Sequence, residues 1–492
     1  MTHAPAILVI APLLSAFVAN LFGRRWPRVC VPAALVGFGC SLVCGLRICA
    51  DVAANGPRQY KLGGWDPPMG IEYVIDYLNA PVLVLIAAVA MLAVFYSQPL
   101  LSELKGRLPH YITLYILLVT GLLGITVTGD AFNLYVLLEI TSLTSYALLG
   151  AAGGRAIFST FRYLIAGTIA ASFYLLGVGY LYMKTGTLNM ADLATRLPAL
   201  ADSPAIMLAF TLIMIGLFIK MGFFPLHGWL PNAYTTASSP TACLVAPLMT
   251  KVTVYIMIRI MFSVFAPSYV FDTLAWQQII IYLACGAIFF GAFNALAQRD
   301  LRRMFAYIIV AEIGYMVGGA WLGNSMGLTG AIYHIVADGA MTLCLFMALG
   351  CVIRNTGGSQ LENLREGFAK MPWTMGAFVI GGLAIIGLPP TCGFFSKWYL
   401  LSGAWEAGQY LFMGALLTSS LVNVVIFFRI IETAFFPAKD AGHDHHHEAP
   451  ERCEAPATML IPLWIVAIAL PLLGLFSGDL IAAFIGPAAQ LP

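Results

Sequence analysis

Charged side chains are scarce in this chain of 492 residues: Asp, Glu, Lys and Arg make up 10% of it, whereas 60% of the residues are hydrophobic. A typical soluble domain has about 25% charged residues, so the composition excludes an ordinary soluble globular protein. Apolar runs of about 20 residues recur from end to end, and a run of that length crosses a bilayer as a helix. These runs do not alternate with polar residues, which excludes a transmembrane β-barrel. The formal net charge of +2 gives no support to nucleic-acid binding.

Paired cysteines are also missing. The ten cysteines form no Cys-x-x-Cys pair and no zinc-type spacing. Most lie inside apolar runs, where a cysteine usually serves as a small packing residue. We therefore expect no iron–sulfur cluster, no metal site and no cofactor of the chain's own. The cysteines inside apolar runs include Cys40, Cys44, Cys285, Cys344 and Cys351.

The apolar runs predict an all-α polytopic membrane protein with about fourteen spans. The first run has no positive segment before it and is predicted to be a spanning helix, not a signal peptide. Two amphipathic stretches, 189–202 and 360–370, are expected at the membrane interface. The predicted spans are 4–22, 29–50, 79–101, 110–128, 131–151, 157–183, 204–224 with a broken extension to about 236, 241–266, 276–297, 302–322, 327–352, 371–392 with an extension to about 405, 409–436 and 457–486.

Basic residues are distributed unevenly between the connecting segments. The connections after even-numbered spans hold few: Arg47, Lys61, Lys184 and Arg196. Cytoplasmic loops are enriched in lysine and arginine, so both termini are predicted on the non-cytoplasmic side of the cell (inner) membrane. The connections after odd-numbered spans hold Arg24, Arg25, Arg28, Lys105, Arg107, Arg155, Arg162, Arg299, Arg302, Arg303, Arg354, Arg365, Lys370, Lys439 and Arg452.

One polar segment, 442–454, is rich in histidine and includes His443 and His447. Metal binding is one interpretation of such a segment, and a solvated cytoplasmic loop is the simpler one. The segment lies far along the chain from most of the buried charges, so it is not included in the predicted mechanism.

Ionisable residues recur inside the apolar spans, where a lysine costs about 2.5–3.5 kcal/mol on insertion scales. The segment 217–251 carries Lys220 in an apolar run, is interrupted by Pro225 and Pro231, and resumes with Lys251. Proline breaks are tolerated where the freed backbone faces protein or a water-filled cavity. A buried charge beside a broken helix predicts an ion pathway. Its candidate members are Glu139, Lys220, His227, Lys251, Glu312, His334, Asp338 and Lys397.

These residues recur at a nearly constant offset: Glu139 and Glu312 are 173 positions apart, Lys220 and Lys397 are 177 apart, and Lys251 and Arg429 are 178 apart. The offset predicts two five-span repeats, each with an acidic residue in its second span and a lysine in a broken fourth span. Because five is odd, the repeats would enter the membrane from opposite sides, as in many transporters. The predicted division is an N-terminal three-helix region (1–108), two inverted repeats (109–266 and 276–436), a polar loop (437–456) and a C-terminal helix (457–492).

A buried carboxylate near a buried lysine has two protonation states of similar free energy, because burial favours the neutral forms and mutual attraction favours the charged forms. A line of such groups therefore predicts a proton relay. Structural alternatives are an ion pair between Glu139 and Lys220 that only joins two helices, snorkelling of Lys397 to the interface, and a satisfied core histidine at His334. The repetition of both charge and helix break favours the relay.

At these residues the chain resembles the antiporter-like subunits shared by respiratory complex I, membrane hydrogenases and Mrp-type sodium/proton antiporters. The resemblance covers about residues 70–435, and length and span number are most similar to the D subunit of Mrp antiporters or the middle subunits of complex I. The matching segments are LYVLLEITSLTSYALL, IKMGFFPLHGWLPNAYTTASSP, MTKVTVYIMIR, LRRMFAYIIVAEIGYM and GLPPTCGFFSKWYLL.

The resemblance implies a proton-translocating subunit that works with other membrane subunits. Glu139 and Lys220 would be the first-half pair, Lys251 the connecting lysine and Lys397 the second-half terminal lysine. An Mrp-like cation/proton antiporter is the leading interpretation. A proton-pumping subunit of a complex I-like NADH:quinone oxidoreductase or a membrane hydrogenase is the alternative, and a structural membrane scaffold is a lesser one. The relay residues do not indicate which cation accompanies the proton, since no dedicated sodium cage is apparent.

The chain departs from the family pattern in its second half. The family usually has a lysine in the eleventh span, where this sequence has Ala337, Asp338 and Thr342. Glu312 stands where a neutral polar residue is common. Either Glu312 and His334 replace the lost lysine, or the second half conducts poorly; we favour replacement.

Overall fold

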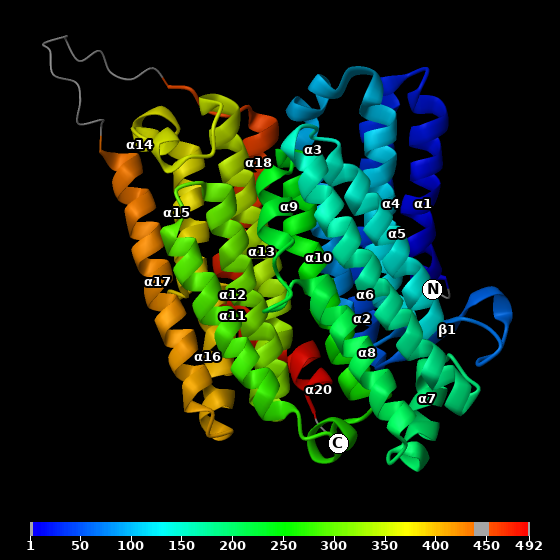
Figure 1. Ribbon diagram of the computed structural model, residues 1–492. Coiled ribbons are helices and arrows are strands. Elements are labelled where there is room, and N and C mark those ends of the chain that lie inside the picture. Colours follow the sequence, from blue (N-terminus) through cyan, green and yellow to red (C-terminus); the bar gives the residue numbers. More distant parts are fainter. Residues whose placement is uncertain (1–2, 437–451, 491–492) are drawn as a thin grey trace, which may run out of the picture.

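The computed structural model describes residues 3–436 and 452–490, and it is a bundle of helices that run side by side (Figure 1). In this part of the chain, thirteen helices are long and apolar enough to cross a membrane. With the broken span formed by α15 and α16, they account for the fourteen predicted spans, and the prediction of an all-α polytopic membrane protein is confirmed. The spanning helices are α1 (Ala4–Gly23), α2 (Cys30–Asn55), α3 (Ala80–Leu101), α4 (Leu108–Val127), α5 (Ala131–Gly150), α6 (Arg155–Thr185), α8 (Pro204–Met221), α10 (Ser239–Arg259), α11 (Gln277–Ala297), α12 (Leu301–Trp321), α13 (Ser325–Thr356), α15 (Pro372–Ile386) with α16 (Cys392–Glu406), α17 (Tyr410–Phe435) and α18 (Ala457–Leu475).

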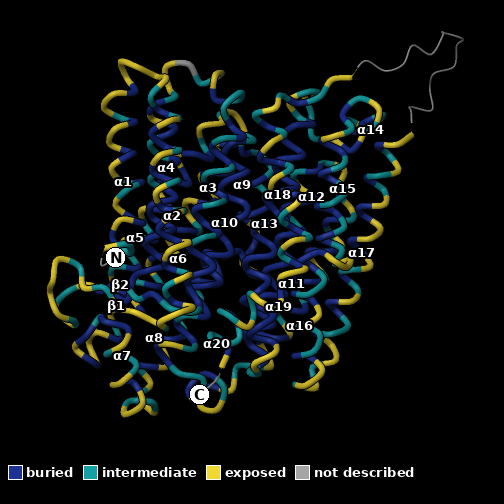
Figure 2. The backbone as a smooth tube through the Cα atoms, turned by 180° about the vertical axis from the view of Figure 1, so that it is seen from behind, coloured by how far each residue is buried: buried dark blue, intermediate teal, exposed yellow. Residues whose placement is uncertain are grey.

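Two helices, α10 and α13, form the centre of the bundle. Every residue in the most apolar window of each helix is buried, and Figure 2 shows these segments in dark blue inside a rim of more exposed helices. A helix that is apolar on all sides is stable when other helices surround it. The polar groups that α10 and α13 carry are therefore held inside protein, away from lipid.

Small residues let neighbouring helices approach closely, as is common in membranes. A Cβ added at Gly216 of α8 would lie 2.6 Å from the Ala170 carbonyl oxygen of α6, and one at Gly177 of α6 would lie 2.8 Å from the Ala209 carbonyl oxygen of α8. Both distances are shorter than side-chain contacts allow. These glycines therefore set the spacing between α6 and α8, which positions Lys220.

Two spans are broken in the same way. Gly222 ends α8 and Gly387 ends α15, each with a positive φ, +72° and +88°, that favours glycine. A proline follows each glycine three residues later, at Pro225 and Pro390. The two breaks are 165 positions apart, whereas their lysines are 177 apart. Lys220 therefore precedes its break and Lys397 follows its break, a difference that the sequence offset did not reveal.

The connections contain short elements at the ends of the bundle. The predicted interfacial stretches contain α7 (Met190–Arg196) and α14 (Gly367–Lys370), and α9 (Leu230–Thr236) continues the first broken span. A two-stranded antiparallel hairpin, β1 (Arg58–Lys61) and β2 (Glu72–Ile75), was not predicted, since each strand is too short to show a clear alternation. The short helices α19 (Ser477–Leu480) and α20 (Gly486–Ala488) end the described chain, where a single continuous span had been predicted. Most of the predicted histidine-rich loop, including His443 and His447, lies outside the described residues, and the predicted domain division stays a prediction.

An ion pair ties the hairpin connection to the central helix. Asp76, which follows β2, accepts hydrogen bonds from both terminal nitrogens of Arg259 in α10, at 2.5 and 2.9 Å. Burial raises the pKa of the Asp76 carboxyl, but the Arg259 charge and hydrogen bonds and two backbone N–H groups outweigh it, so the net pKa is below its usual value. The pair is partly buried, and it fixes the end of α10 against the start of α3.

We predict that Asp76→Asn lowers the stability of the purified protein by about 1.5–3 kcal/mol at neutral pH, the range for hydrogen bonds to charged groups. A carboxyl with a lowered folded-state pKa stabilises the fold above its unfolded value of about 3.9 and loses this effect as the pH falls through the folded value. The difference from wild type should therefore shrink in acid. Thermal unfolding in detergent measures it. Asp66→Asn, which removes an exposed pair with Lys61, is the control and should change little; equal effects of the two substitutions would contradict the prediction.

Candidate functional site

Seven of the eight candidate residues lie inside the bundle on α5, α8, α10, α12, α13 and α16, and His227 lies in the break between α8 and α9. Glu139 is half-buried and the others are buried. Buried ionisable groups inside a membrane protein are costly and are usually paired or line a pathway. The contacts of these side chains divide them into three groups.

In the first group, a serine connects Lys220 to the helix of Glu139. The Lys220 ammonium donates a short hydrogen bond to the Ser142 hydroxyl, which in turn donates to the Leu138 carbonyl at 2.6 Å. Ser142 follows Glu139 by three positions in α5 and therefore lies on the same helix face. Within the described part of the chain, no ion pair shorter than 4.0 Å joins Glu139 to Lys220. Ser142 thus connects Lys220 to the helix that carries Glu139, and Oε1 of the Glu139 carboxylate has no hydrogen-bond partner among the described residues.

The second group lies at the centre and joins α10 to α13. The Nζ of Lys251 lies 3.0 Å from Oδ2 of Asp338, and both side chains are fully buried. Thr342, one turn further along α13, donates to Asp338 Oδ1 at 2.7 Å and accepts from Lys251 Nζ at 3.4 Å. Thr342, at the position where the resemblance leads us to expect a lysine, therefore bridges the acid and the base. Lys251 from the first half supplies the positive charge next to Asp338.

The third group is a chain of contacts in the second half. Nε2 of His334 lies 2.5 Å from Oε2 of Glu312, and its Nδ1 lies 2.9 Å from the Ser396 hydroxyl. Glu312 and His334 are fully buried. Because one ring nitrogen faces a carboxylate and the other faces a hydroxyl, the imidazole can accept a proton on one side and release one on the other. His334 also precedes Asp338 by four positions, so both side chains lie on one face of α13.

Lys397 interacts with neutral groups. Its ammonium donates to the carbonyl oxygens of Ile385 and Ile386 at 2.6 and 3.3 Å, and to the Ser420 hydroxyl at 3.2 Å. Both carbonyls end α15, where the helix dipole favours a positive charge. The ammonium also lies 5.3 Å from the centre of the Tyr315 ring, within the range of a cation–π contact. No carboxylate of the described chain lies within 4.0 Å of it.

Ser142 and Tyr315 occupy corresponding places in the two halves. Ser142 follows Glu139 by three positions and contacts Lys220, whereas Tyr315 follows Glu312 by three positions and contacts Lys397. The offset between Ser142 and Tyr315 is the same 173 positions that separates the glutamates. In each half, the residue one turn after the glutamate thus contacts the lysine of the broken span.

The position of His227 differs from that of the other candidates. Its ring packs against Phe224 and Phe290, with centroids 5.5 and 4.6 Å apart. Its buried Nδ1 has no hydrogen-bond partner among the described residues. His227 therefore contacts α11 through the ring of Phe290. Among the described residues, no hydrogen bond joins it to another candidate residue.

Sequence reasoning did not identify Ser142, Tyr315 and Ser396 as parts of the site. Serine and tyrosine are common in membrane helices. Only the offset of 173, applied to the position three residues after each glutamate, could have indicated Ser142 and Tyr315. Among the described residues, no group of three or more His, Cys, Asp or Glu side chains could hold a metal ion. The arrangement brings several proton donors and acceptors to hydrogen-bond distance from one another in the interior of the bundle.

Comparisons with known proteins identify the family and the fold. The family described as NADH:quinone oxidoreductase/Mrp antiporter, transmembrane region, matches residues 128–422. The chain is 44% identical to NADH-quinone oxidoreductase subunit N of Desulforudis audaxviator, over 98% of this chain and 97% of the relative. It is 29% identical to the D subunit of the Na(+)/H(+) antiporter of Alkalihalophilus pseudofirmus, over 93% of each. A chain in the structure of a membrane-bound sulfane sulfur reductase, an archaeal respiratory membrane complex, matches with a TM-score of 0.90 at 28% identity, over 99% of this chain and 97% of that chain.

We predict that Lys251→Met and Asp338→Asn each lower stability by about 3–5 kcal/mol, because each leaves a buried polar or charged group without its partner. The double variant should lose less stability than the two single variants lose together, since it removes both groups. Thermal unfolding of the four proteins in detergent forms a double-mutant cycle that measures the coupling. Strictly additive effects would contradict a direct interaction between the two side chains.

Proposed function

The chain belongs to the family of antiporter-like membrane subunits shared by NADH:quinone oxidoreductases and Mrp antiporters, and from this membership we propose that it translocates protons along its buried polar side chains. The observation that carries the proposal is the succession of short contacts through the interior. Lys220 contacts Ser142, Lys251 contacts Asp338, and His334 contacts both Glu312 and Ser396. A proton that moves along one contact alters the charge balance at the next, which links the stations energetically.

The second half works, in this proposal, through Glu312 and His334 in place of the family lysine. These two groups share a short hydrogen bond, and His334 reaches Ser396, the residue next to Lys397. This supports replacement of the lost lysine over loss of conduction. The contacts supply a donor and an acceptor at each step from α12 to α16.

A redox-linked assembly fits the comparisons better than an Mrp-like antiporter, which reverses the order of our two interpretations. Identity to an NADH-quinone oxidoreductase chain is 44%, whereas identity to a sodium/proton antiporter chain is 29%. The likeness to a respiratory membrane complex also supports this order. We propose that the redox chemistry belongs to partner subunits and that this chain carries the protons. An Mrp-like cation/proton antiporter is the second candidate, supported by the match over 93% of the antiporter chain.

We propose that partner membrane subunits bind the chain, and the surroundings of Glu139 support this. Its helix α5 exposes large apolar side chains on both sides of it, Val136 and Leu143, with Leu143 60% exposed. Oε1 of Glu139 is buried without a hydrogen-bond partner among the described residues. A carboxylate so near the rim of one subunit is costly against lipid. A neighbouring membrane protein that covers this face of α5 would remove that cost.

We also propose that the end of the bundle with the basic connections faces the cytoplasm of a cell whose inner membrane holds the protein. The basic connections lie at one end of the bundle, the C-terminus lies at the other, and α1 begins away from the basic end and runs toward it (Figure 1). The bias in lysine and arginine orients membrane proteins in this sense.

We predict that Glu139→Gln and Lys220→Met each abolish proton transport while the complex still assembles, because each removes a proton-binding group from the first half. Ser142→Ala should slow transport by at least tenfold, since the Lys220 contact to α5 is lost. Proton flux into vesicles that contain the purified complex measures all three. Glu432→Gln, an exposed glutamate near the end of α17, is the matched control. Wild-type flux in both the Glu139 and the Lys220 variants would reject the proposed function.

The proposed orientation predicts from which side of the membrane a reagent can reach two surface positions. Cys453 is exposed near the basic end, and Met69, in the hairpin at the other end, is 91% exposed. A membrane-impermeant maleimide should label Cys453 only in inside-out vesicles. In a Cys453→Ser background, it should label Met69→Cys only in intact spheroplasts. The opposite pattern would reverse the assigned orientation.

A further inference from the structure

Three arginines line a cavity at the basic end of the bundle, where α6, α9 and α12 meet. The cavity has a volume of about 410 Å³. Both α6 and α12 contact the short helix α9, which follows the break in the first broken span. Its lining includes Arg155, Phe158, Arg162, Asn232, Thr235 and Arg303.

No carboxylate of the described chain forms an ion pair with these three arginines. Arg302 next to them donates to the Ser239 hydroxyl at 2.9 Å, and Arg299 lies 4.0 Å from Glu362. In contrast, Arg162 lies over the Phe158 ring at 4.5 Å and Arg303 lies 6.0 Å from the centre of the Tyr307 ring. An aromatic ring orients a guanidinium group but leaves its charge and most of its N–H donors for another partner.

The cavity offers donors and positive charge and lacks acidic groups. The guanidinium groups bind phosphate oxygens in a bidentate manner. The Asn232 amide donates to the Gly228 carbonyl at 3.2 Å and has a second N–H to offer. The lining contains no aspartate or glutamate. This chemistry fits a phosphate ester better than a carboxylate-bearing metal complex or a cation.

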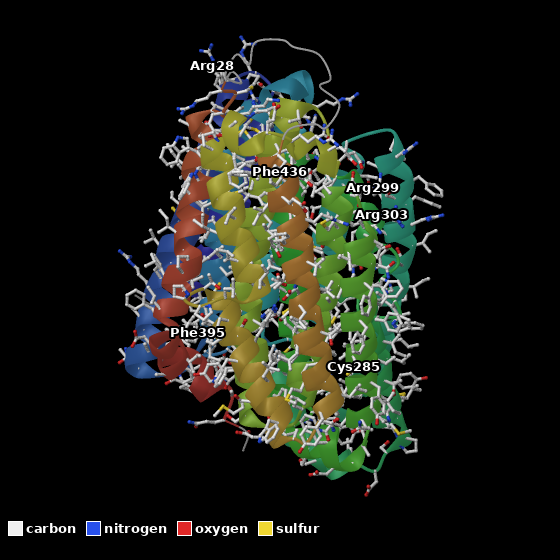
Figure 3. All side chains as sticks on the ribbon, turned by 90° about the vertical axis from the view of Figure 1, so that its left-hand side faces the viewer. Arg28, Cys285, Arg299, Arg303, Phe395 and Phe436 are labelled. Atoms are coloured by element: carbon white, nitrogen blue, oxygen red, sulfur yellow. The ribbon has the colours of Figure 1, made fainter. Side chains whose placement is uncertain are left out.

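The surroundings favour a phosphate that is attached to acyl chains. Beside the arginines, α6 exposes Phe161 and Ile165, at 56% and 44%, and the break before α9 exposes Leu226 at 40%. Basic pockets between membrane helices at the cytoplasmic end are known binding sites for lipid headgroups. Figure 3 shows Arg303 and Arg299 toward the end of the spans at which Arg28 also lies. We propose that this cavity binds the headgroup of an anionic phospholipid, whose acyl chains follow α6 past the break.

The bound lipid would contact α9 through Asn232, so it would hold the second part of the broken span against α6 and α12. This site is separate from the proton relay, since none of the relay residues lines it. Loss of lipid binding therefore tests the site without testing proton transport.

Native mass spectrometry of the purified complex, with full-length chain and phosphatidylglycerol or phosphatidylethanolamine of equal chain length, tests the proposal. Wild type should retain phosphatidylglycerol in preference to phosphatidylethanolamine. The triple variant Arg155→Gln, Arg162→Gln, Arg303→Gln should bind phosphatidylglycerol about a hundredfold more weakly, because each basic residue near an anionic surface contributes a factor of roughly five. The matched control changes Arg24, Arg25 and Arg28, three exposed arginines at the same end, to glutamine and should retain the lipid.

Asn232→Asp places a negative charge in the same cavity without a change in size, and it should also weaken retention if the triple variant fails to assemble. Equal retention of the two lipids by wild type would overturn the proposal. Undiminished retention of phosphatidylglycerol by the triple variant would also overturn it. Where the triple variant does not assemble, the same result with Asn232→Asp would overturn it. Glycerol 1-phosphate at millimolar concentration should leave the bound phosphatidylglycerol in place. Complete displacement would show a site for soluble phosphate esters and would overturn the assignment to a lipid.

Discussion

The charges inside the spans must be compensated within the protein, because hydrocarbon provides neither water nor counter-ions. The ion pair between Lys251 and Asp338 meets this constraint at the centre of the bundle. It joins α10 to α13, the two helices whose apolar windows are completely buried. Because Lys251 belongs to the first predicted repeat and Asp338 to the second, the pair also makes the two halves one electrostatic unit. The other polar contacts lie on either side of it.

The three buried lysines differ in what stabilises their charge. Lys251 faces a carboxylate, Lys220 faces a single hydroxyl, and Lys397 faces carbonyl groups at a helix end together with an aromatic ring. An ammonium with one neutral partner gains little from being charged, whereas an ammonium beside a carboxylate gains much. Lys220 is thus the buried lysine with the fewest polar contacts among the described residues. Lys220 and Lys397 each lie close to a helix break and reach a polar group on another helix.

The sequence predicted the architecture well and pointed to the buried ionisable residues, because both depend on features that hydrocarbon makes conspicuous. Runs of about twenty apolar residues predict spans, and a glutamate or lysine inside such a run is rare enough to indicate a functional site. The contacts could not be predicted in the same way. Ser142 and Tyr315 are ordinary residues in a membrane helix, and their roles depend on where the side chains of Lys220 and Lys397 reach. The register of the breaks was hidden as well, since Lys220 precedes Gly222 and Lys397 follows Gly387.

Thr342 stands where the resemblance leads us to expect a lysine, and this difference has a physical consequence for the second half. A second ammonium at that position would stand beside Lys251 and would need a further acid, whereas the threonine hydroxyl satisfies both Asp338 and Lys251 without charge. Our proposal assigns the role of that lysine to His334, which shares a 2.5 Å contact with Glu312. A proton on this pair can reside on either partner without a change in the net charge of the interior. The histidine pair therefore retains the capacity to bind and release a proton that the threonine lacks, and it does so one helical turn from the central ion pair.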